Sequence, residues 1–154
     1  MGELMIQLKE ITQENYKACV KITVDKEQEK FVAPNWYSLL EAKFEKDRKA
    51  FGLYNEEEMI GFIMFSYYLA DEDYGKDSWW IERYMIASPY QNKGFGTKGL
   101  QQSLTWFTEH FPAEDLRISA VEGNQIAQDL YEKLGFVVTG EKVEDEIVLL
   151  KTAE

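Results

Sequence analysis

The chain is organised around one glycine-rich stretch, Gln91-Asn92-Lys93-Gly94-Phe95-Gly96. An apolar segment ends at Ala87, shortly before it, and a run with helical character follows it. A helix that begins on glycines presents unpaired backbone N–H groups and the positive end of its dipole to an anion. Lysines within and just after the stretch add positive charge. We therefore expect these residues to hold a pyrophosphate group.

Other glycine-rich nucleotide motifs fit this stretch less well. Residues 94–99 also satisfy the dinucleotide fingerprint G-x-G-x-x-G, with Glu122 near the place of its ribose-binding acid. That fingerprint follows its strand almost directly, whereas six residues separate Ala87 from Gly94. The P-loop pattern is absent from the sequence, and the kinase loop would need valine where Gln101 stands. An NAD-binding module therefore stays only a remote alternative.

A second set of motifs lies downstream: Asn124-Gln125-Ile126-Ala127 and Leu130-Tyr131-Glu132-Lys133-Leu134-Gly135-Phe136. Together with the glycine-rich stretch they resemble the GCN5-related N-acetyltransferase (GNAT) superfamily, and the resemblance covers nearly the whole chain. It implies a mixed α+β fold, with a central twisted mixed sheet of about seven strands flanked by about four helices. It also implies acetyl-CoA as the cofactor, and it leaves a homodimer open as the assembly.

Composition limits the classes of protein that remain. With 154 residues we expect a single domain over residues 1–154. One cysteine, Cys19, excludes an internal disulfide, and one histidine, His110, leaves no Cys/His cluster for zinc, so we expect no metal site. We expect His110 at the surface or at a helix end. The sequence has neither a signal-peptide pattern nor an apolar run of the ~18 residues that span a membrane, which indicates a cytoplasmic protein.

The net charge of −11 argues against nucleic acid as a partner, because phosphate binding needs a basic face. An acidic surface would instead attract a polycation and raise its encounter rate. A contribution to solubility alone is the simpler explanation of the charge, and it stays open.

Hydrophobic periodicity and turn residues predict the order of the elements. We expect strands at residues 5–10, 50–54, 59–70, 78–87, 116–121, 136–142 and 145–151. We expect helices to follow Thr12, Asn35, the glycine-rich stretch and Asn124, with the two leading helices capped by Thr12 and Asn35. The long apolar run at residues 59–65 suits a strand that is covered on both faces.

The resemblance also implies which residues hold acetyl-CoA. The pyrophosphate would be lined by Gln91, Asn92, Lys93, Gly94, Phe95, Gly96, Thr97 and Lys98. The pantetheine amides would bond the backbone of Tyr84, Met85 and Ile86. The other side of the pantetheine would contact Asn124 and Ala127, and Asn124 can serve as a helix N-cap as well.

The family's general acid maps onto Tyr131. A tyrosine, with an ordinary pKa of ~10, carries at neutral pH the proton that a thiolate leaving group needs, since a thiol has a pKa of ~8.5. Tyrosine at a helical position is also a common core residue, so a packing role is the alternative for Tyr131.

Acetyl transfer also requires the acceptor amine to lose its proton. An amine with a pKa of ~10.4 is neutral about once in 2,500 molecules at pH 7, a deficit of ~4.6 kcal/mol. A carboxylate acting through water in a partly dry cleft would reduce this deficit, and Glu82 on the central strand is our candidate. An ion pair with a neighbour is the equal alternative for Glu82. We find no Cys or Ser placed as a nucleophile, which favours direct transfer in a ternary complex.

Within the superfamily the chain is most similar to bacterial spermine/spermidine acetyltransferases, in residues 24–32, 52–54 and 80–86. A polyamine carries several positive charges and would favour an acidic, aromatic-lined cleft. We therefore expect substrate contacts from Glu27, Glu29, Trp36, Tyr37 and Glu82, with Asp71, Glu72 and Asp73 as further candidates.

Two other functions remain open. The chain could be a GNAT enzyme that acts on another small-molecule amine or on a protein N-terminus, with antibiotics and amino acids among the candidates. It could instead be a non-catalytic acyl-CoA-binding module, against which the presence of Tyr131 counts.

Overall fold

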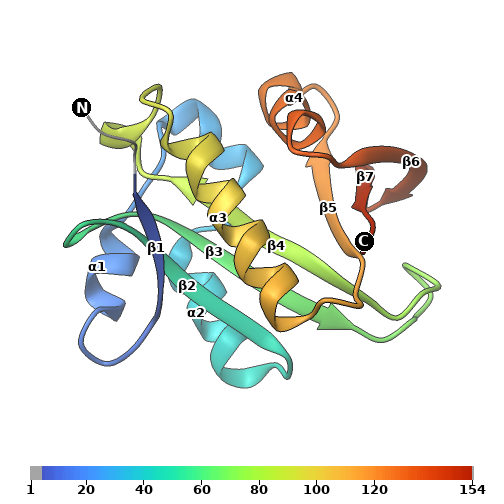
Figure 1. The fold of residues 1–154 in the computed structure, drawn as a ribbon, viewed down its shortest axis with the longest axis horizontal. Coiled ribbons are helices and arrows are strands. Elements are labelled where there is room, and N and C mark those ends of the chain that lie inside the picture. The colour runs from blue at the N-terminus through green and yellow to red at the C-terminus, as the bar shows by residue number, and fades with distance from the viewer. Residues whose placement is uncertain (1–4, 154) are drawn as a thin grey trace.

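The fold is built on one seven-stranded sheet with helices on both faces (Figure 1). It is seen in a computed structural model that describes residues 5–153. The strands are β1 (Ile6–Glu10), β2 (Arg48–Asn55), β3 (Glu58–Tyr68), β4 (Ser78–Ile86), β5 (Leu116–Val121), β6 (Val137–Val143) and β7 (Glu146–Lys151). The helices are α1 (Tyr16–Lys21), α2 (Asn35–Phe44), α3 (Phe95–His110) and α4 (Gln125–Lys133), with short 3₁₀ helices at Lys26–Phe31 and Ser88–Tyr90.

The sheet has one parallel joint. Its strands lie in the order β1-β2-β3-β4-β5-β7-β6, and every neighbouring pair is antiparallel except β4 and β5. That joint spans only residues 79–81 of β4 and 116–118 of β5. Beyond it the two strands separate, and residues 83–86 of β4 pair with β3 alone. We call this divergence the β4–β5 opening.

Strand β3 carries the core on both of its faces, as its continuous apolar run predicts. Ile63 and Phe65 belong to the cluster that packs under α3, whereas Phe62 and Met64 belong to the cluster with α1 and α2. All four side chains are fully buried. Because successive strand residues point to opposite faces, an alternating pattern would have left one face exposed to water.

The observed fold confirms the predicted fold class, with a mixed sheet of seven strands and four α-helices. The start of each leading helix was predicted wrongly. Thr12 begins a turn in which its carbonyl accepts from Asn15 and Tyr16, and the helix starts only at Tyr16. Asn35 is already helical, and its buried side chain donates to the Cys19 carbonyl at 2.9 Å. Asn35 therefore joins α2 to α1 and does not cap a helix.

Two expectations concern the chain as a whole: a single domain, and the absence of a segment that spans a membrane. The prediction of one domain over residues 1–154 extends to residues 1–4 and 154, which lie outside the described residues. No helix within residues 5–153 is long and apolar enough to cross a membrane.

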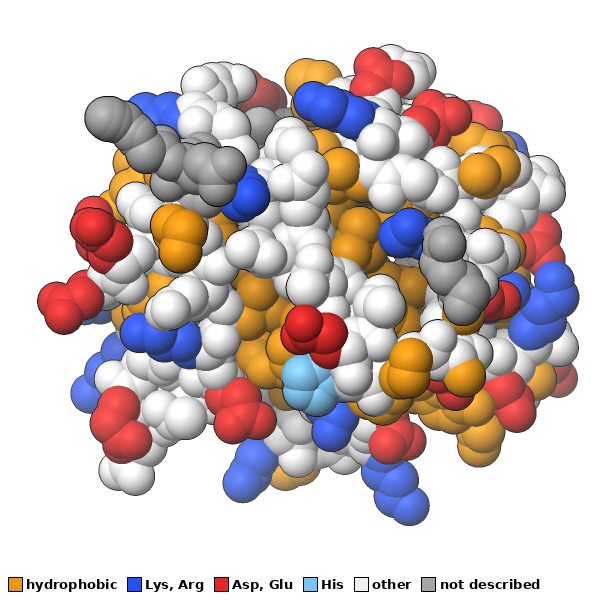
Figure 2. All heavy atoms as spheres, viewed as in Figure 1, with side chains coloured by type: hydrophobic (Ala, Val, Ile, Leu, Met, Phe, Trp, Pro, Cys, Tyr) orange, Lys and Arg blue, Asp and Glu red, His pale blue; other side chains and the backbone are white. Residues whose placement is uncertain are grey.

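Figure 2 shows acidic and basic side chains interspersed on the face that α3 covers, so the net negative charge does not form one field there. His110 is exposed at the end of α3, as predicted.

Candidate active site

The glycine-rich stretch turns the chain into the N-terminus of α3. Gly94 is the N-cap residue and has φ 89°, a left-handed conformation that favours glycine. The first backbone bond within the helix runs from Lys98 N–H to Gly94 C=O, so the amides of residues 95–97 precede it. At Gly96, an added Cβ would meet nothing within 4 Å. These features fit an anion that approaches the backbone closely.

Side chains tie this loop to its neighbours. The Gln91 Nε2 group donates to the Ile86 carbonyl at 2.8 Å and to Gln28 Oε1 at 2.9 Å. The Tyr84 hydroxyl donates to the Gly96 carbonyl at 2.5 Å, and burial raises the pKa of Tyr84. The end of β4, the loop and the first turn of α3 are thereby held together.

The remaining residues expected at the donor site lie around the same loop. Asn92 and Lys93 are exposed on it, whereas Thr97 and Lys98 are half-buried in the first turn of α3. Across the β4–β5 opening, the Asn124 side chain accepts a bond from the Ala127 amide at 3.3 Å and so caps α4. The helix-capping role expected for Asn124 is therefore present.

A cleft of about 560 Å³ lies beside the β4–β5 opening. Three connecting segments form its wall: residues 30–33 before α2, residues between 68 and 76 after β3, and residues 143–146 between β6 and β7. Its floor brings together Glu82 and Tyr84 from β4 with Tyr131 from α4. Two of the proposed catalytic side chains, far apart in sequence, thus line one cavity.

Tyr131 is almost buried but still lines this cleft. Its residue exposure is 8%, and its ring meets Phe136 edge-on at 6.1 Å. Burial raises the pKa of Tyr131 to about 12, and the negative charge of Glu146 adds to the rise. The hydroxyl therefore keeps its proton across the physiological range of pH.

Glu82 sits at a β-bulge in β4. Met64 of β3 pairs with Arg83, and the next residue, Phe65, pairs with Ile81, which leaves Glu82 as the extra residue. A bulge re-aims a side chain and is common beside active sites. In this chain the bulge residue is Glu82 itself, and its side chain lines the cleft.

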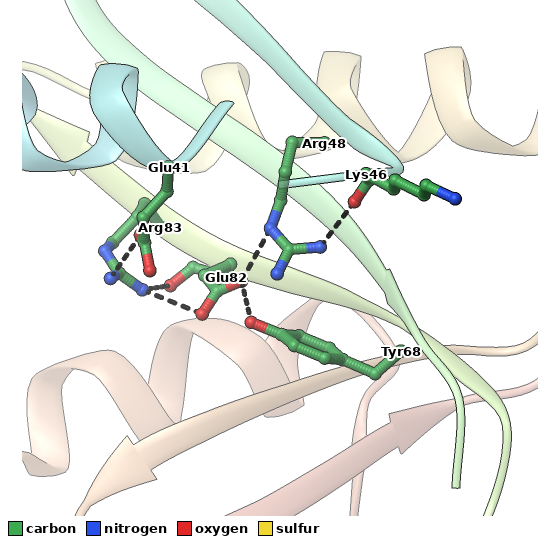
Figure 3. A network of polar contacts seen from close by, with 6 residues as sticks. All are labelled: Glu41, Lys46, Arg48, Tyr68, Glu82 and Arg83. Atoms are coloured by element: carbon green, nitrogen blue, oxygen red, sulfur yellow. Dashed lines mark hydrogen bonds and ion pairs between the residues drawn. The ribbon is translucent and has the colours of Figure 1, made fainter. Parts of the chain in front are cut away.

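Figure 3 shows that the Glu82 carboxylate has several partners. The Tyr68 hydroxyl donates to its Oε1 at 2.5 Å, and the Arg83 guanidinium pairs with its Oε2 at 3.2 Å. The Nε of Arg48 lies 3.8 Å from Oε1, and that guanidinium stacks over the Tyr68 ring at 4.5 Å. The ion pair expected as the alternative for Glu82 is therefore present, at a position that also faces the cleft.

Four of the expected substrate contacts lie elsewhere. Trp36 and Tyr37 are 53% and 45% exposed on the outer face of α2, and Glu27 and Glu29 are exposed on the 3₁₀ helix before it. The cleft lining contains none of these four described residues. Of the further candidates, Asp71 and Asp73 do line it.

Several lining residues were not singled out from the sequence: Tyr68, Tyr74, Ser119, Glu144 and Glu146. Tyr74 fixes the loop after β3, because its hydroxyl donates to Glu141 Oε1 at 2.7 Å and the Arg117 guanidinium lies 5.5 Å from its ring. No sequence spacing links these positions, since they meet only through the pairing of β3 with β4, β4 with β5, and β5 with β7.

Known proteins are similar to this chain in architecture and in sequence. Residues 6–136 match the profile of the Acetyltransferase (GNAT) family. The spermine/spermidine N(1)-acetyltransferase of Bacillus subtilis (strain 168) is 30% identical over 139 residues, which cover 90% of this chain and 91% of that protein.

Two solved structures with a coenzyme illustrate the shared fold. PaiA N-acetyltransferase from Thermoplasma acidophilum, in complex with coenzyme A, has a TM-score of 0.66 at 15% identity over 97% of this chain and 99% of that one. A GNAT family acetyltransferase from Elizabethkingia anophelis, with acetyl-CoA bound, has a TM-score of 0.62 at 17% identity over 96% and 97%. The family resemblance is thereby confirmed, and the chain belongs to the GNAT family of acetyltransferases.

Proposed function

We propose that this chain transfers an acetyl group from acetyl-CoA to a primary amine of a polyamine such as spermine or spermidine. As a member of the GNAT family the chain is an acetyl-CoA-dependent N-acetyltransferase. The observation that carries the polyamine proposal is the lining of the cleft. It holds five carboxylates against three basic side chains, together with six aromatic rings.

These groups suit a long polycation. Asp71, Asp73 and Glu144 are exposed along the rim, while Glu82 and Glu146 lie deeper. Rim carboxylates would attract the charged amines that do not react, and aromatic faces bind ammonium groups by cation–π contact. The similarity to the Bacillus subtilis enzyme named for spermine and spermidine supports the same substrate class.

The donor would be held by the residues around the N-terminus of α3. The amides of residues 95–97, with Gln91, Asn92, Lys93, Gly94 and Lys98, would bind its pyrophosphate. The β4 edge at Tyr84, Met85 and Ile86 would bond its pantetheine amides, with Asn124 and Ala127 opposite. The open space over Gly96 is consistent with this fit.

Within this proposal, Glu82 and Tyr131 carry the proton transfers. Glu82 would draw a proton from the ammonium group through a water molecule, and the bulge and its three partners would fix the carboxylate in place. Tyr131 would supply the proton that the departing thiolate takes. Transfer would be direct, within a ternary complex. The cytoplasmic location and the homodimer stay predictions.

The test is thiol release from acetyl-CoA with spermine, spermidine, lysine, an aminoglycoside and a short peptide as acceptors. We expect the highest kcat/KM for the polyamines, falling as salt rises, because exposed charges are screened. The double variant Asp71→Asn/Asp73→Asn should raise KM for spermine more than KM for lysine. The control Glu56→Gln/Glu57→Gln removes the same charge from the exposed β2–β3 turn and should change neither value.

Other outcomes would redirect the proposal. Turnover confined to a different amine would retain the enzyme and discard the polyamine. Acetyl-CoA binding without turnover of any acceptor would favour the acyl-CoA-binding module.

A further inference from the structure

The acetyl transfer requires more proton acceptors than the residues assigned so far. An ammonium nitrogen must lose two protons to become an amide nitrogen: one before it attacks, and one as the C–N bond forms. The proposed role of Glu82 accounts for the first proton. The thiolate takes one proton from Tyr131, which must then be reprotonated. A group beside Tyr131 that can carry the second proton would satisfy both needs.

Glu146 occupies such a place. It is the first residue of β7, pairs with Val121 of β5, and lines the floor of the cleft near Tyr131. The Ser119 hydroxyl, also in the lining, donates to its Oε1 at 2.6 Å. This bond orients the carboxylate and leaves its second oxygen to other partners.

The surroundings of Glu146 differ from those of Glu82. Glu82 is held between Arg48 and Arg83. In the part of the chain that the structure describes, no lysine or arginine lies within 4.0 Å of the Glu146 carboxylate. The Glu146 carboxylate therefore lines the cleft with the Ser119 hydroxyl as its hydrogen-bond partner and with no ion pair to hold it.

Glu146 also acts on Tyr131 directly. Burial is the main cause of the raised pKa of Tyr131, and the negative charge of Glu146 is the second cause. Besides burial, the Tyr131 side chain raises the pKa of the Tyr84 hydroxyl on β4. Glu146, Tyr131 and Tyr84 all line the same cleft, so the carboxylate that influences the Tyr131 phenol also faces the space where the acceptor would bind.

We propose that Glu146 is a further catalytic residue, which accepts the second proton from the acceptor nitrogen and returns it to Tyr131. The proposal rests on the acetyl transfer proposed above. The C–N bond forms and the C–S bond breaks, the sulfur takes the Tyr131 proton, and the nitrogen proton passes through Glu146 to the Tyr131 oxygen. Both side chains then regain their starting states, and the single net proton leaves by way of Glu82.

This order of steps has an electrostatic advantage. When Glu146 takes its proton, the negative charge that disfavours ionised Tyr131 disappears. Tyr131 therefore becomes a stronger acid at the moment when the thiolate departs. A neutral residue at position 146 would lack this coupling.

The test compares Glu146→Gln with Asp145→Asn, which removes the same charge one residue away, outside the cleft lining. With spermine and acetyl-CoA, we expect Glu146→Gln to lower kcat about 10²-fold, the lower range for acid–base groups, with the Kd for acetyl-CoA unchanged. Asp145→Asn should stay within about twofold of the parent. A kcat for Glu146→Gln as close to the parent as that would overturn the proposal.

A second measurement does not depend on activity. The ultraviolet titration curve of Tyr131→Phe, subtracted from that of the parent, gives the ionisation step of Tyr131. The same difference is then taken between Glu146→Gln and the double variant Glu146→Gln/Tyr131→Phe. We expect the ionisation step of Tyr131 at lower pH in this second difference. An unmoved step would overturn the coupling. If the parent does not acetylate spermine, the polyamine proposal fails, and the kinetic comparison is made with the best acceptor of the panel.

Discussion

The role proposed for Tyr131 places two conflicting demands on its pKa. A general acid works best with a pKa near the working pH, but burial has raised this one to about 12. Against a thiol pKa of ~8.5, proton transfer to the thiolate is uphill by ~3.5 pKa units, or ~4.8 kcal/mol. The same burial keeps the proton in place until it is needed. A neighbour that lowers the pKa of Tyr131 during the reaction should therefore make proton transfer to the thiolate easier.

The Tyr131 hydroxyl can be removed with little change in shape. Tyr131→Phe should lower kcat about 10²-fold while leaving the acetyl-CoA Kd nearly unchanged, because the lost group acts in the proton transfer. In the parent, kcat should show no alkaline decline from this group up to pH 10, given its pKa of about 12. Steady-state kinetics from pH 6 to 10 check both points, with Tyr16→Phe on the exposed face of α1 as the control. An unchanged kcat would remove the acid role.

Single residues also show where prediction from sequence stops. Trp36 and Tyr37 are aromatic and lie in a segment similar to polyamine enzymes, yet α2 presents them to solvent. The inner face of α2 carries the buried polar residues Asn35 and Ser38 beside Leu39 and Ala42, which pack on the core. A polar residue inside and an aromatic residue outside is the reverse of the usual preference, so hydrophobicity alone could not orient this helix.

At the scale of elements, the glycine-rich loop and α3 were the most predictable part. The cap, the helix and its buried stripe all lie within one continuous segment, so local chemistry determines them. The cleft is different, because its wall comes from three connections that meet only after the sheet has formed. Glu146 reaches Ser119 through the antiparallel register of β5 and β7, which no local pattern encodes.

The start of α3 offers a variant in which folding and donor binding should change in opposite directions. At Gly96 a methyl group meets no protein atom within 4 Å, and alanine favours a helix over glycine by about 1 kcal/mol. Gly96→Ala should therefore keep or raise the melting temperature while weakening acetyl-CoA binding by at least about tenfold, or 1.4 kcal/mol. Calorimetry and thermal unfolding would measure both.

Gly75→Ala is the matched control, since its added methyl also meets nothing within 4 Å and it lies in the loop after β3. Acetyl-CoA binding by Gly96→Ala at parental affinity would refute the anion cradle. Gly94 is less suitable for this test, because its left-handed φ of 89° would add backbone strain to any steric effect.

At the scale of the whole molecule, buried ionisable groups limit stability in alkali. Burial raises the pKa of the Cys19 thiol from 9.0 to about 12 and that of Tyr131 from 10.0 to about 12. Each raised pKa means that the folded state holds its proton more tightly than the unfolded chain. Stability is then fully present below the unfolded pKa and is lost as pH rises towards 12.

The free energy of unfolding should consequently be flat from pH 7 to about 8.5 and fall above it. Each group contributes up to about 1.4 kcal/mol per pH unit, starting near pH 9 for Cys19 and near pH 10 for Tyr131. Urea unfolding at pH 8, 9, 10 and 11 gives the slope. Cys19→Ala should flatten it between pH 9 and 10, and an unaltered slope there would exclude the thiol as a contributor.

The β4–β5 opening has a consequence for how the protein responds to its surroundings. A molecule whose amides pair with residues 84–86 would act as a short extra strand in the middle of the sheet. Such binding belongs to the folded state alone, so mass action would stabilise the fold by about 2.7 kcal/mol at a donor concentration of 100 Kd. The lifetime of this protein in a cell would then follow the supply of its acetyl donor, and starvation for that donor would expose it to proteases.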